Sequence, residues 1–128
     1  MQIRCHHIDH VQVCIPPGTE EAARAFYENI LHFHRVQKPA SLKDRPTMWF
    51  QNGSIELHVA VDPVIKRTKQ HPAMIVEEIE AVRAHLIQHG IQPHEEPDIP
   101  DRKRFSFLDP FGNRIEFLEY FKDRKLGT

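Results

Sequence analysis

Residues 108–120 read Leu-Asp-Pro-Phe-Gly-Asn-Arg-Ile-Glu-Phe-Leu-Glu-Tyr, a reversing turn that leads directly into a strand. Pro110 fixes φ for the turn, Gly112 can adopt positive φ, and Asp109 can accept hydrogen bonds from nearby amides. In the strand that follows, alternate side chains point to opposite faces. The apolar residues on either side of Glu116 share one face, so Glu116 points to the other. We expect this carboxylate to face a cavity.

The composition is that of one ordinary globular domain. The chain has 128 residues, 40% of them apolar, which suffices for a hydrophobic core. Its formal net charge of −1 gives no general attraction to nucleic acid or to anionic lipid. We find no apolar run of about 18 residues and no signal-peptide pattern, so we expect a cytoplasmic protein without membrane association. Two cysteines, Cys5 and Cys14, are too few for a disulfide framework.

The first part of the chain predicts a strand followed by a helix. Residues 8–15 alternate as a strand that places His10 and Gln12 on its more polar face. A Pro-Pro-Gly sequence ends this strand. Thr19 is then expected to cap a helix, which should end near His32.

Two further strands are expected after a polar connection. Residues 47–51 and 54–61 alternate as strands, and Asn52-Gly53 between them is a strong hairpin signal. Alternation places Glu56 and His58 together on the less apolar face of the second strand.

The same order of elements repeats after a polar linker at 62–70. The pattern predicts a strand at 71–76, a helix at 77–89, a charged loop at 93–103 and strands at 104–108 and 114–121. Both parts of the chain therefore read strand, helix, strands.

The repeat also extends to the residues that could bind a metal ion. His10 and Glu56 are 46 positions apart, and His71 and Glu116 are 45 apart. Each copy of the repeat thus supplies a histidine on its first strand and a glutamate on its last. If the curved sheets of the two copies face one another, these four side chains meet around one divalent ion.

Several motifs resemble the vicinal oxygen chelate superfamily, which includes glyoxalase I, fosfomycin-resistance proteins and extradiol dioxygenases. They are Ile8-Asp9-His10-Val11, Ala25-Phe26-Tyr27 with Ile30-Leu31, Ile55-Glu56-Leu57, and Asp109-Pro110-Phe111-Gly112-Asn113-Arg114-Ile115-Glu116. The resemblance implies an α+β fold in which βαβββ modules at 4–61 and 71–121 form one cup-shaped, eight-stranded mixed sheet. It also implies a single domain spanning 1–128, and usually a homodimer.

The resemblance implies that His10, Glu56, His71 and Glu116 are the metal ligands. This donor set suits Ni²⁺, Co²⁺, Mn²⁺, Fe²⁺ or Zn²⁺. The implied activity is that of a glyoxalase-like lyase or isomerase, acting on a small molecule with adjacent oxygens through a metal-stabilised enediolate. Glu56 or Glu116 would be the catalytic group that moves the proton.

Three further side chains are expected near the ligands or the substrate, namely His58, Gln12 and Arg104. His58 lies about 6.6 Å from Glu56 along the same strand face, so it could also be a ligand or an acid or base. Arg104 belongs to a charged loop edge that is either simply solvated or a clamp for an anionic substrate. His85 and His89 are spaced i,i+4 on a helix, where a solvated edge is the simpler interpretation.

Glutathione is a doubtful substrate component. Relatives that use it commonly carry Arg and Asn at the positions of Cys14 and Ala60, and neither residue here can replace those groups. Two alternatives stay open. One is a fosfomycin-resistance-type thiol transferase or an extradiol-type dioxygenase, which needs only two histidines and one carboxylate. The other is a metal-free binding module like the bleomycin-resistance proteins.

Overall fold

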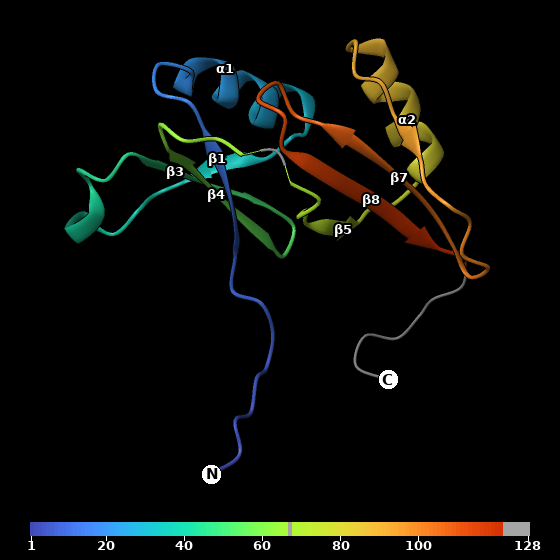
Figure 1. The fold of residues 1–128 in the computed structure, drawn as a ribbon, viewed down its shortest axis with the longest axis horizontal. Helices are drawn as coiled ribbons and strands as arrows, with labels where there is room; N and C mark the ends of the chain where they lie inside the picture. The colour runs from blue at the N-terminus through green and yellow to red at the C-terminus, as the bar shows by residue number, and fades with distance from the viewer. Residues whose placement is uncertain (67, 122–128) are drawn as a thin grey trace. The chain divides into compact units, whose positions relative to one another are not determined.

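The computed structural model describes residues 1–66 and 68–121. The chain divides into two compact units, Met1–Ile65 and Lys66–Thr128. Each unit has its own four-stranded sheet (Figure 1). The division falls inside the predicted linker at 62–70, of which Arg67 lies outside the described residues.

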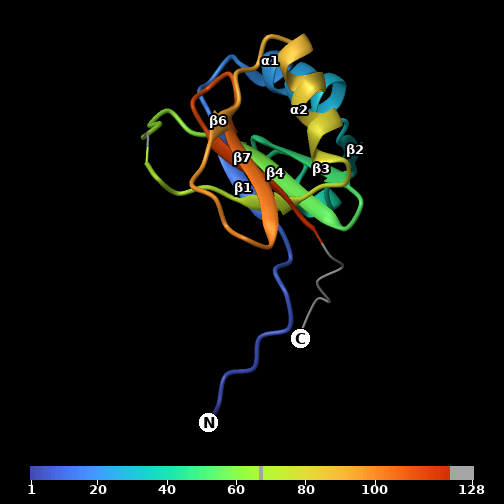
Figure 2. The same ribbon diagram turned by 90° about the vertical axis from the view of Figure 1, so that its right-hand side faces the viewer.

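Unit 1 is a βαβββ module. Its elements are β1 (Val11–Ile15), α1 (Glu20–Arg24), the π-helix η1 (Ala25–Ile30), β2 (His34–Val36), the 3₁₀-helix η2 (Ala40–Leu42), β3 (Thr47–Asn52) and β4 (Ile55–Val61). The sheet order is β1-β4-β3-β2, in which β1 runs parallel to β4 and the other pairs are antiparallel. Figures 1 and 2 both show α1 and η1 on one side of these strands.

Unit 2 has the same topology. Its elements are β5 (Ala73–Ile75), α2 (Ile79–Gln88), β6 (His94–Glu95), β7 (Arg102–Leu108) and β8 (Arg114–Tyr120). The sheet order is β5-β8-β7-β6, again with the first pair parallel and the others antiparallel. The predicted α+β class with repeated βαβββ modules is therefore confirmed.

The turn before β8 forms as its sequence predicts. The carboxylate of Asp109 is buried, and its Oδ1 accepts hydrogen bonds from the amides of Phe111 and Asn113 at 2.9 and 2.8 Å. Its Oδ2 accepts a third, at 2.8 Å, from the side-chain amide of Asn113. Gly112 takes φ of 91°, the positive value that glycine adopts without strain. These bonds fix the point at which β8 begins.

One face of each sheet packs in its unit's core. In unit 1 the rings of Tyr27 on η1 and Phe50 on β3 lie 6.1 Å apart, and both are fully buried. In unit 2 the rings of Phe105, Phe107 and Phe117 pack on one another, with centroid distances of 4.9 to 6.2 Å. Because strand side chains alternate, the polar residues between these core positions lie on the opposite face of each sheet.

Several predicted boundaries are wrong. β1 begins at Val11 rather than at residue 8, because its partner β4 begins only at Ile55 and pairs from Leu57 onward. Thr19 stands at the N-cap of α1, but its hydroxyl donates to the carbonyl of Pro16 and does not cap the helix.

The eight-stranded fold implied by the resemblance requires the short strands β2 and β6, but the residue pattern did not locate them. Both are edge strands of two or three residues whose exposed side chains carry no clear alternation. The helix in unit 1 does end where expected, and His32 follows it with φ of 61°. In the described part of the chain, no helix has the length and apolar character needed to cross a bilayer.

Candidate functional site

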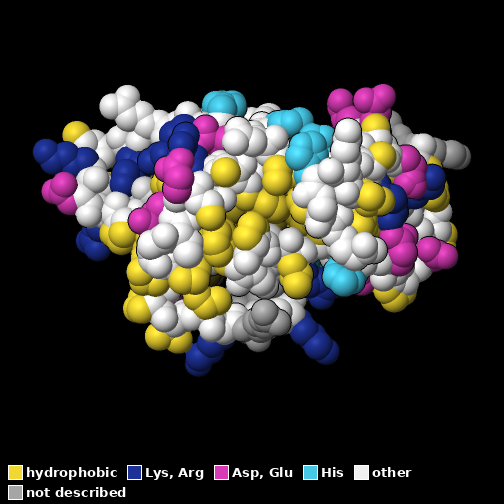
Figure 3. Space-filling view, turned by 90° about the horizontal axis from the view of Figure 1, so that it is seen from above, with side chains coloured by type: hydrophobic (Ala, Val, Ile, Leu, Met, Phe, Trp, Pro, Cys, Tyr) yellow, Lys and Arg dark blue, Asp and Glu magenta, His cyan; other side chains and the backbone are white. Residues whose placement is uncertain are grey.

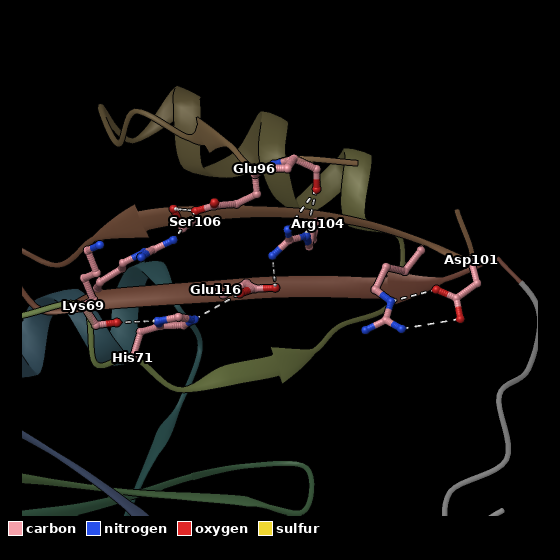
Figure 4. Close-up of polar contacts among 10 residues, drawn as sticks. Lys69, His71, Glu96, Asp101, Arg104, Ser106 and Glu116 are labelled. Atoms are coloured by element: carbon pink, nitrogen blue, oxygen red, sulfur yellow. Dashed lines mark hydrogen bonds and ion pairs between the residues drawn. The ribbon is translucent and has the colours of Figure 1, made fainter. Parts of the chain in front are cut away.

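In unit 2, His71 and Glu116 are brought together as a pair. Nε2 of His71 lies 3.1 Å from Oε1 of Glu116 (Figure 4). Glu116 comes from the middle of β8 and is only 7% exposed, and His71 lies just before β5, the strand parallel to β8. The spacing of 45 positions in the sequence therefore corresponds to a direct contact in the folded module.

The hydrogen bonding of His71 decides which ring nitrogen faces the carboxylate. Nδ1 lies 2.8 Å from the carbonyl oxygen of Lys69, which can only accept, so Nδ1 carries a proton. In the neutral ring, Nε2 then presents a lone pair toward an oxygen of Glu116. Two acceptor atoms 3.1 Å apart need a proton or a cation between them. That separation also suits neighbouring ligands of an ion bound at about 2.1 Å.

Arg104 holds the other oxygen of the Glu116 carboxylate. Its Nη1 lies 3.4 Å from Oε2 of Glu116, while Nε and Nη2 donate to the carbonyl of Pro97 at 3.2 and 2.9 Å. Figure 4 shows the guanidinium reaching from β7 toward Glu116 on the adjacent strand. The arginine thus fixes the orientation of the Glu116 carboxylate through this charge-assisted contact.

A second ionic group lies on the same face of the sheet. Ser106, which is paired with Glu116 in the β7–β8 register, donates from its hydroxyl to Glu96 at 2.7 Å, and Arg114 contacts the same carboxylate oxygen. The pKa of Glu96 is lowered, first by the Ser106 hydrogen bond and then by that of Arg114, against an opposing effect of burial. Glu96 therefore remains a carboxylate, and this face of unit 2 carries both charges.

In unit 1, the ring of His10 is oriented by Asp9. Nδ1 of His10 lies 2.9 Å from Oδ2 of Asp9, so the carboxylate accepts the Nδ1 proton and Nε2 is the nitrogen available to a ligand. The same hydrogen bond is the largest cause of the lowered pKa of Asp9. His10 directly precedes Val11, which pairs with Leu57, so His10 and Glu56 occupy adjacent positions at one end of the β1–β4 pair.

The carboxylate of Glu56 is bound by His58. Nε2 of His58 lies 2.7 Å from Oε2 of Glu56, and His58 is only 5% exposed. Its ring is stacked between those of His10 and Trp49, with centroid distances of 3.9 and 4.1 Å. His58 therefore contacts Glu56, its neighbour on the same face of β4. Trp49, on β3, forms one side of this stack.

The remaining predicted residues lie as follows. Gln12 is exposed and pairs with His58 in the β1–β4 register, so it shares the face that carries Glu56. His85 and His89 have ring centroids 4.4 Å apart on α2, and Nδ1 of His89 bonds the carbonyl of its own helix at His85. Sequence reasoning missed the contribution of Asp9, although a carboxylate next to a candidate histidine ligand is a recognisable signal.

Each unit therefore supplies a matched pair of potential ligands, His10 with Glu56 and His71 with Glu116. Within either unit, the described residues contain no group of three or more His, Cys, Asp and Glu side chains arranged to hold a metal ion.

The paired βαβββ modules, each with a histidine before its first strand and a glutamate on its last, define a class of protein. A model of the Glyoxalase/Bleomycin resistance protein/Dioxygenase superfamily matches residues 7–117. The chain belongs to this superfamily.

Three solved structures illustrate the similarity. A Bacillus anthracis protein assigned to the glyoxalase family is 42% identical, with a TM-score of 0.86 over 94% of this chain and 99% of that one. A glyoxalase family protein from Enterococcus faecalis is 27% identical, with a TM-score of 0.71 over 88% and 97%. TnmS3, an antibiotic-binding protein from Streptomyces sp. CB03234, is 17% identical, with a TM-score of 0.68 over 93% and 99%, and it shows the fold alone.

Proposed function

We propose that the protein is a metal-dependent lyase or isomerase of glyoxalase type, which acts on a small molecule with adjacent oxygen atoms. His10, Glu56, His71 and Glu116 would hold one divalent ion, with the ligands drawn from one chain or from two copies of it. The observation that carries the proposal is the state of the two histidines. In both, Nδ1–H is engaged by an oxygen acceptor, which leaves Nε2 as the ligand nitrogen.

The bound ion would supply Lewis-acid polarisation of two adjacent substrate oxygens. The chain's own residues account for the remaining chemistry. A carboxylate, Glu56 or Glu116, would take the proton from the carbon next to the substrate carbonyl and return it to the neighbouring carbon. Arg104 contacts one oxygen of Glu116, and His58 contacts one oxygen of Glu56, so both carboxylates are oriented before substrate arrives.

The test combines metal content with proton exchange. We expect the purified protein, reconstituted with Ni²⁺, Co²⁺, Mn²⁺, Fe²⁺ or Zn²⁺, to retain a stoichiometric ion by elemental analysis. In D₂O it should exchange the carbon-bound proton of a small α-hydroxycarbonyl compound, followed by NMR. Glu116→Ala should lose both properties. A reconstituted wild-type protein that retains no stoichiometric ion would end the proposal.

One contact favours a second candidate. Because Oε2 of Glu56 is occupied by His58, the ligand set could reduce to His10, His71 and Glu116. Two histidines and one carboxylate are the set of many non-haem iron oxygenases, and of the thiol transferases and dioxygenases of this superfamily. If Glu56→Ala keeps full metal occupancy, this candidate replaces the first. A chain that binds no metal but saturably binds a small organic compound would instead be a binding module.

A further inference from the structure

A groove of about 360 Å³ lies in unit 1 on the side of the sheet that carries the helix. It is bounded by the first residues of α1, by the connection at 39–46 and by Arg35 on β2. Its floor is apolar and consists of Met48, Val59 and Val61, from β3 and β4.

The groove is separate from the candidate metal ligands. On β4, Val59 and Val61 alternate with His58, so they lie on the face opposite to that of Glu56 and His58. Met48 pairs with Val59 in the β3–β4 register and therefore belongs to the groove side as well. The sheet therefore separates this groove from the face that carries Glu56 and His58.

The charges around the groove are not balanced. Arg24 forms ion pairs with Glu21 and Glu28, and the carboxylate of Glu20 accepts a hydrogen bond from the backbone amide of Gly18. The guanidinium of Arg24 is thus already paired on the α1 side of the groove, and the carboxylate of Glu20 is held by a backbone amide.

Arg35 and Arg45 are different. The guanidinium of Arg35 lies 5.7 Å from the ring centre of Phe50, a cation–π contact that leaves its N–H groups free to bind. Within the described residues, neither the side chain of Arg35 nor that of Arg45 forms a hydrogen bond or an ion pair. Figure 3 shows several Lys and Arg side chains at the left of the view, with Asp and Glu side chains among them.

The backbone at Arg45 is held in place although its side chain is not. Its amide donates to the carbonyl of Leu42 at 3.0 Å. Its carbonyl accepts from Nζ of Lys38 at 2.7 Å and from the amide of Thr47 at 2.8 Å. A fixed backbone that presents an unpaired guanidinium beside an apolar floor is preorganised for an anion, since little loop ordering is needed on binding.

We propose that this groove binds a small organic anion, whose carboxylate or phosphate group pairs with Arg35 and Arg45 and whose short apolar part rests on Met48, Val59 and Val61. Planar guanidinium groups match the oxygens of these anions. The volume is at the lower end of that of small-molecule sites, so the ligand is of metabolite size. This site is additional to the proposed catalytic function and does not depend on it.

The test is a titration of the full-length protein, monitored by amide chemical shifts, with n-butyl phosphate, pentanoate and n-butanol as probes. We expect n-butyl phosphate or pentanoate to saturate shifts at residues of β3, β4 and the 39–46 connection. The neutral alcohol should cause no saturable shift. The tighter of the two anions identifies the phosphate or the carboxylate as the preferred group.

Two variants test the role of the arginines. In the double variant Arg35→Gln with Arg45→Gln, affinity should fall roughly tenfold or more, because charge-assisted hydrogen bonds are lost. Lys43→Gln, a charge removal in the same connection but outside the groove lining, should bind as the wild type does. Amide spectra of the free variants establish that they are folded. Unchanged affinity in the double variant, or the absence of saturable shifts with both anions, would overturn the proposal.

Discussion

At the scale of single residues, the ring orientations of His10 and His71 each depend on an acceptor one or two residues earlier in the chain. The carboxylate of Asp9 accepts a hydrogen bond from Nδ1 of His10, and the carbonyl of Lys69 accepts one from Nδ1 of His71. The two acceptors differ in kind, since only the first is a side chain. Asp9 is therefore the one that substitution can remove.

Asp9→Ala should weaken metal binding without abolishing it. Loss of the carboxylate frees the His10 ring to rotate and lowers the basicity of Nε2, effects that typically cost about 10- to 100-fold in metal affinity. Competition with a chromophoric chelator measures this change. Asp44→Ala, which removes an exposed carboxylate elsewhere in unit 1, is the matched control and should retain wild-type affinity. Equal affinity in Asp9→Ala and wild type would show that His10 is not a ligand oriented in this way.

Arg104 and Glu116 form an ion pair whose contribution can be measured without any metal. The side chains are 19% and 9% exposed, so water screens the pair only in part. Arg104→Met leaves the buried carboxylate with His71 as its one partner among the contacts described above. We expect the metal-free protein to lose about 1–2 kcal/mol in its free energy of unfolding, measured in urea.

The control for this prediction is a substitution of the preceding residue, Lys103. Lys103 is 53% exposed and only 4.0 Å from Glu80, so Lys103→Met should change the unfolding free energy by less than about 0.5 kcal/mol. If both variants lose the same unfolding free energy, the Arg104–Glu116 contact contributes no more than an ordinary surface ion pair.

At the scale of elements, the N-terminus of α2 is capped by a carboxylate from the strand β8. Glu119 on β8 accepts hydrogen bonds from the amides of Glu78 and Ile79, both at 3.0 Å. These amides belong to the start of the helix, where donors lack partners within the helix. The pKa of Glu119 is lowered, first by the Ile79 bond and then by that of Glu78.

This cap predicts a pH dependence of stability. Because the folded state lowers the pKa of Glu119 below its ordinary value of 4.5, its contribution is present above that value. It is lost as the pH falls through the folded-state pKa. Glu119→Gln should therefore unfold at a lower temperature than wild type at pH 7, and the difference should shrink toward pH 3. Glu77→Gln, an exposed change just before the helix, should show no such dependence.

Elements with strong local signals could be predicted from the sequence, and elements defined by their partners could not. The turn at Asp109, the hairpin at Asn52-Gly53 and β8 follow from residue types and alternation. β2 and β6 are too short for alternation to be visible and exist because a neighbouring strand pairs with them. The π-helical form of η1 could not be predicted either, because its apolar residues recur at ordinary α-helical spacing.

The same distinction applies to the candidate site. The repeat proposed His71 and Glu116 as ligands of one ion. Their direct contact follows from the parallel β5–β8 pairing, which the spacing alone does not specify. The hydrogen bond of His58 to Glu56 and its stacking on Trp49 depend on side-chain rotamers on two neighbouring strands, β3 and β4. No pattern along the chain specifies those rotamers.

At the scale of the whole molecule, the repeat makes a prediction about stoichiometry. Neither unit's described residues gather three or more potential ligands, and a pair alone is a weak site. If the proposed ion needs ligands from both units, removing one from either should abolish the same binding event. His10→Ala and His71→Ala should therefore each reduce bound metal from one ion per chain to nearly none.

The pattern of loss separates the possible arrangements. His34→Ala removes an exposed histidine on β2 and should leave metal content unchanged, which controls for general binding by the ten histidines. Loss in His71→Ala with full occupancy in His10→Ala would assign the ion to unit 2 alone. The shared four-ligand site would then be wrong, while the fold and family of the chain would stand. A site shared by the two ligand pairs requires that both variants lose their bound metal equally. Elemental analysis measures this loss, in proteins whose amide spectra match that of the wild type.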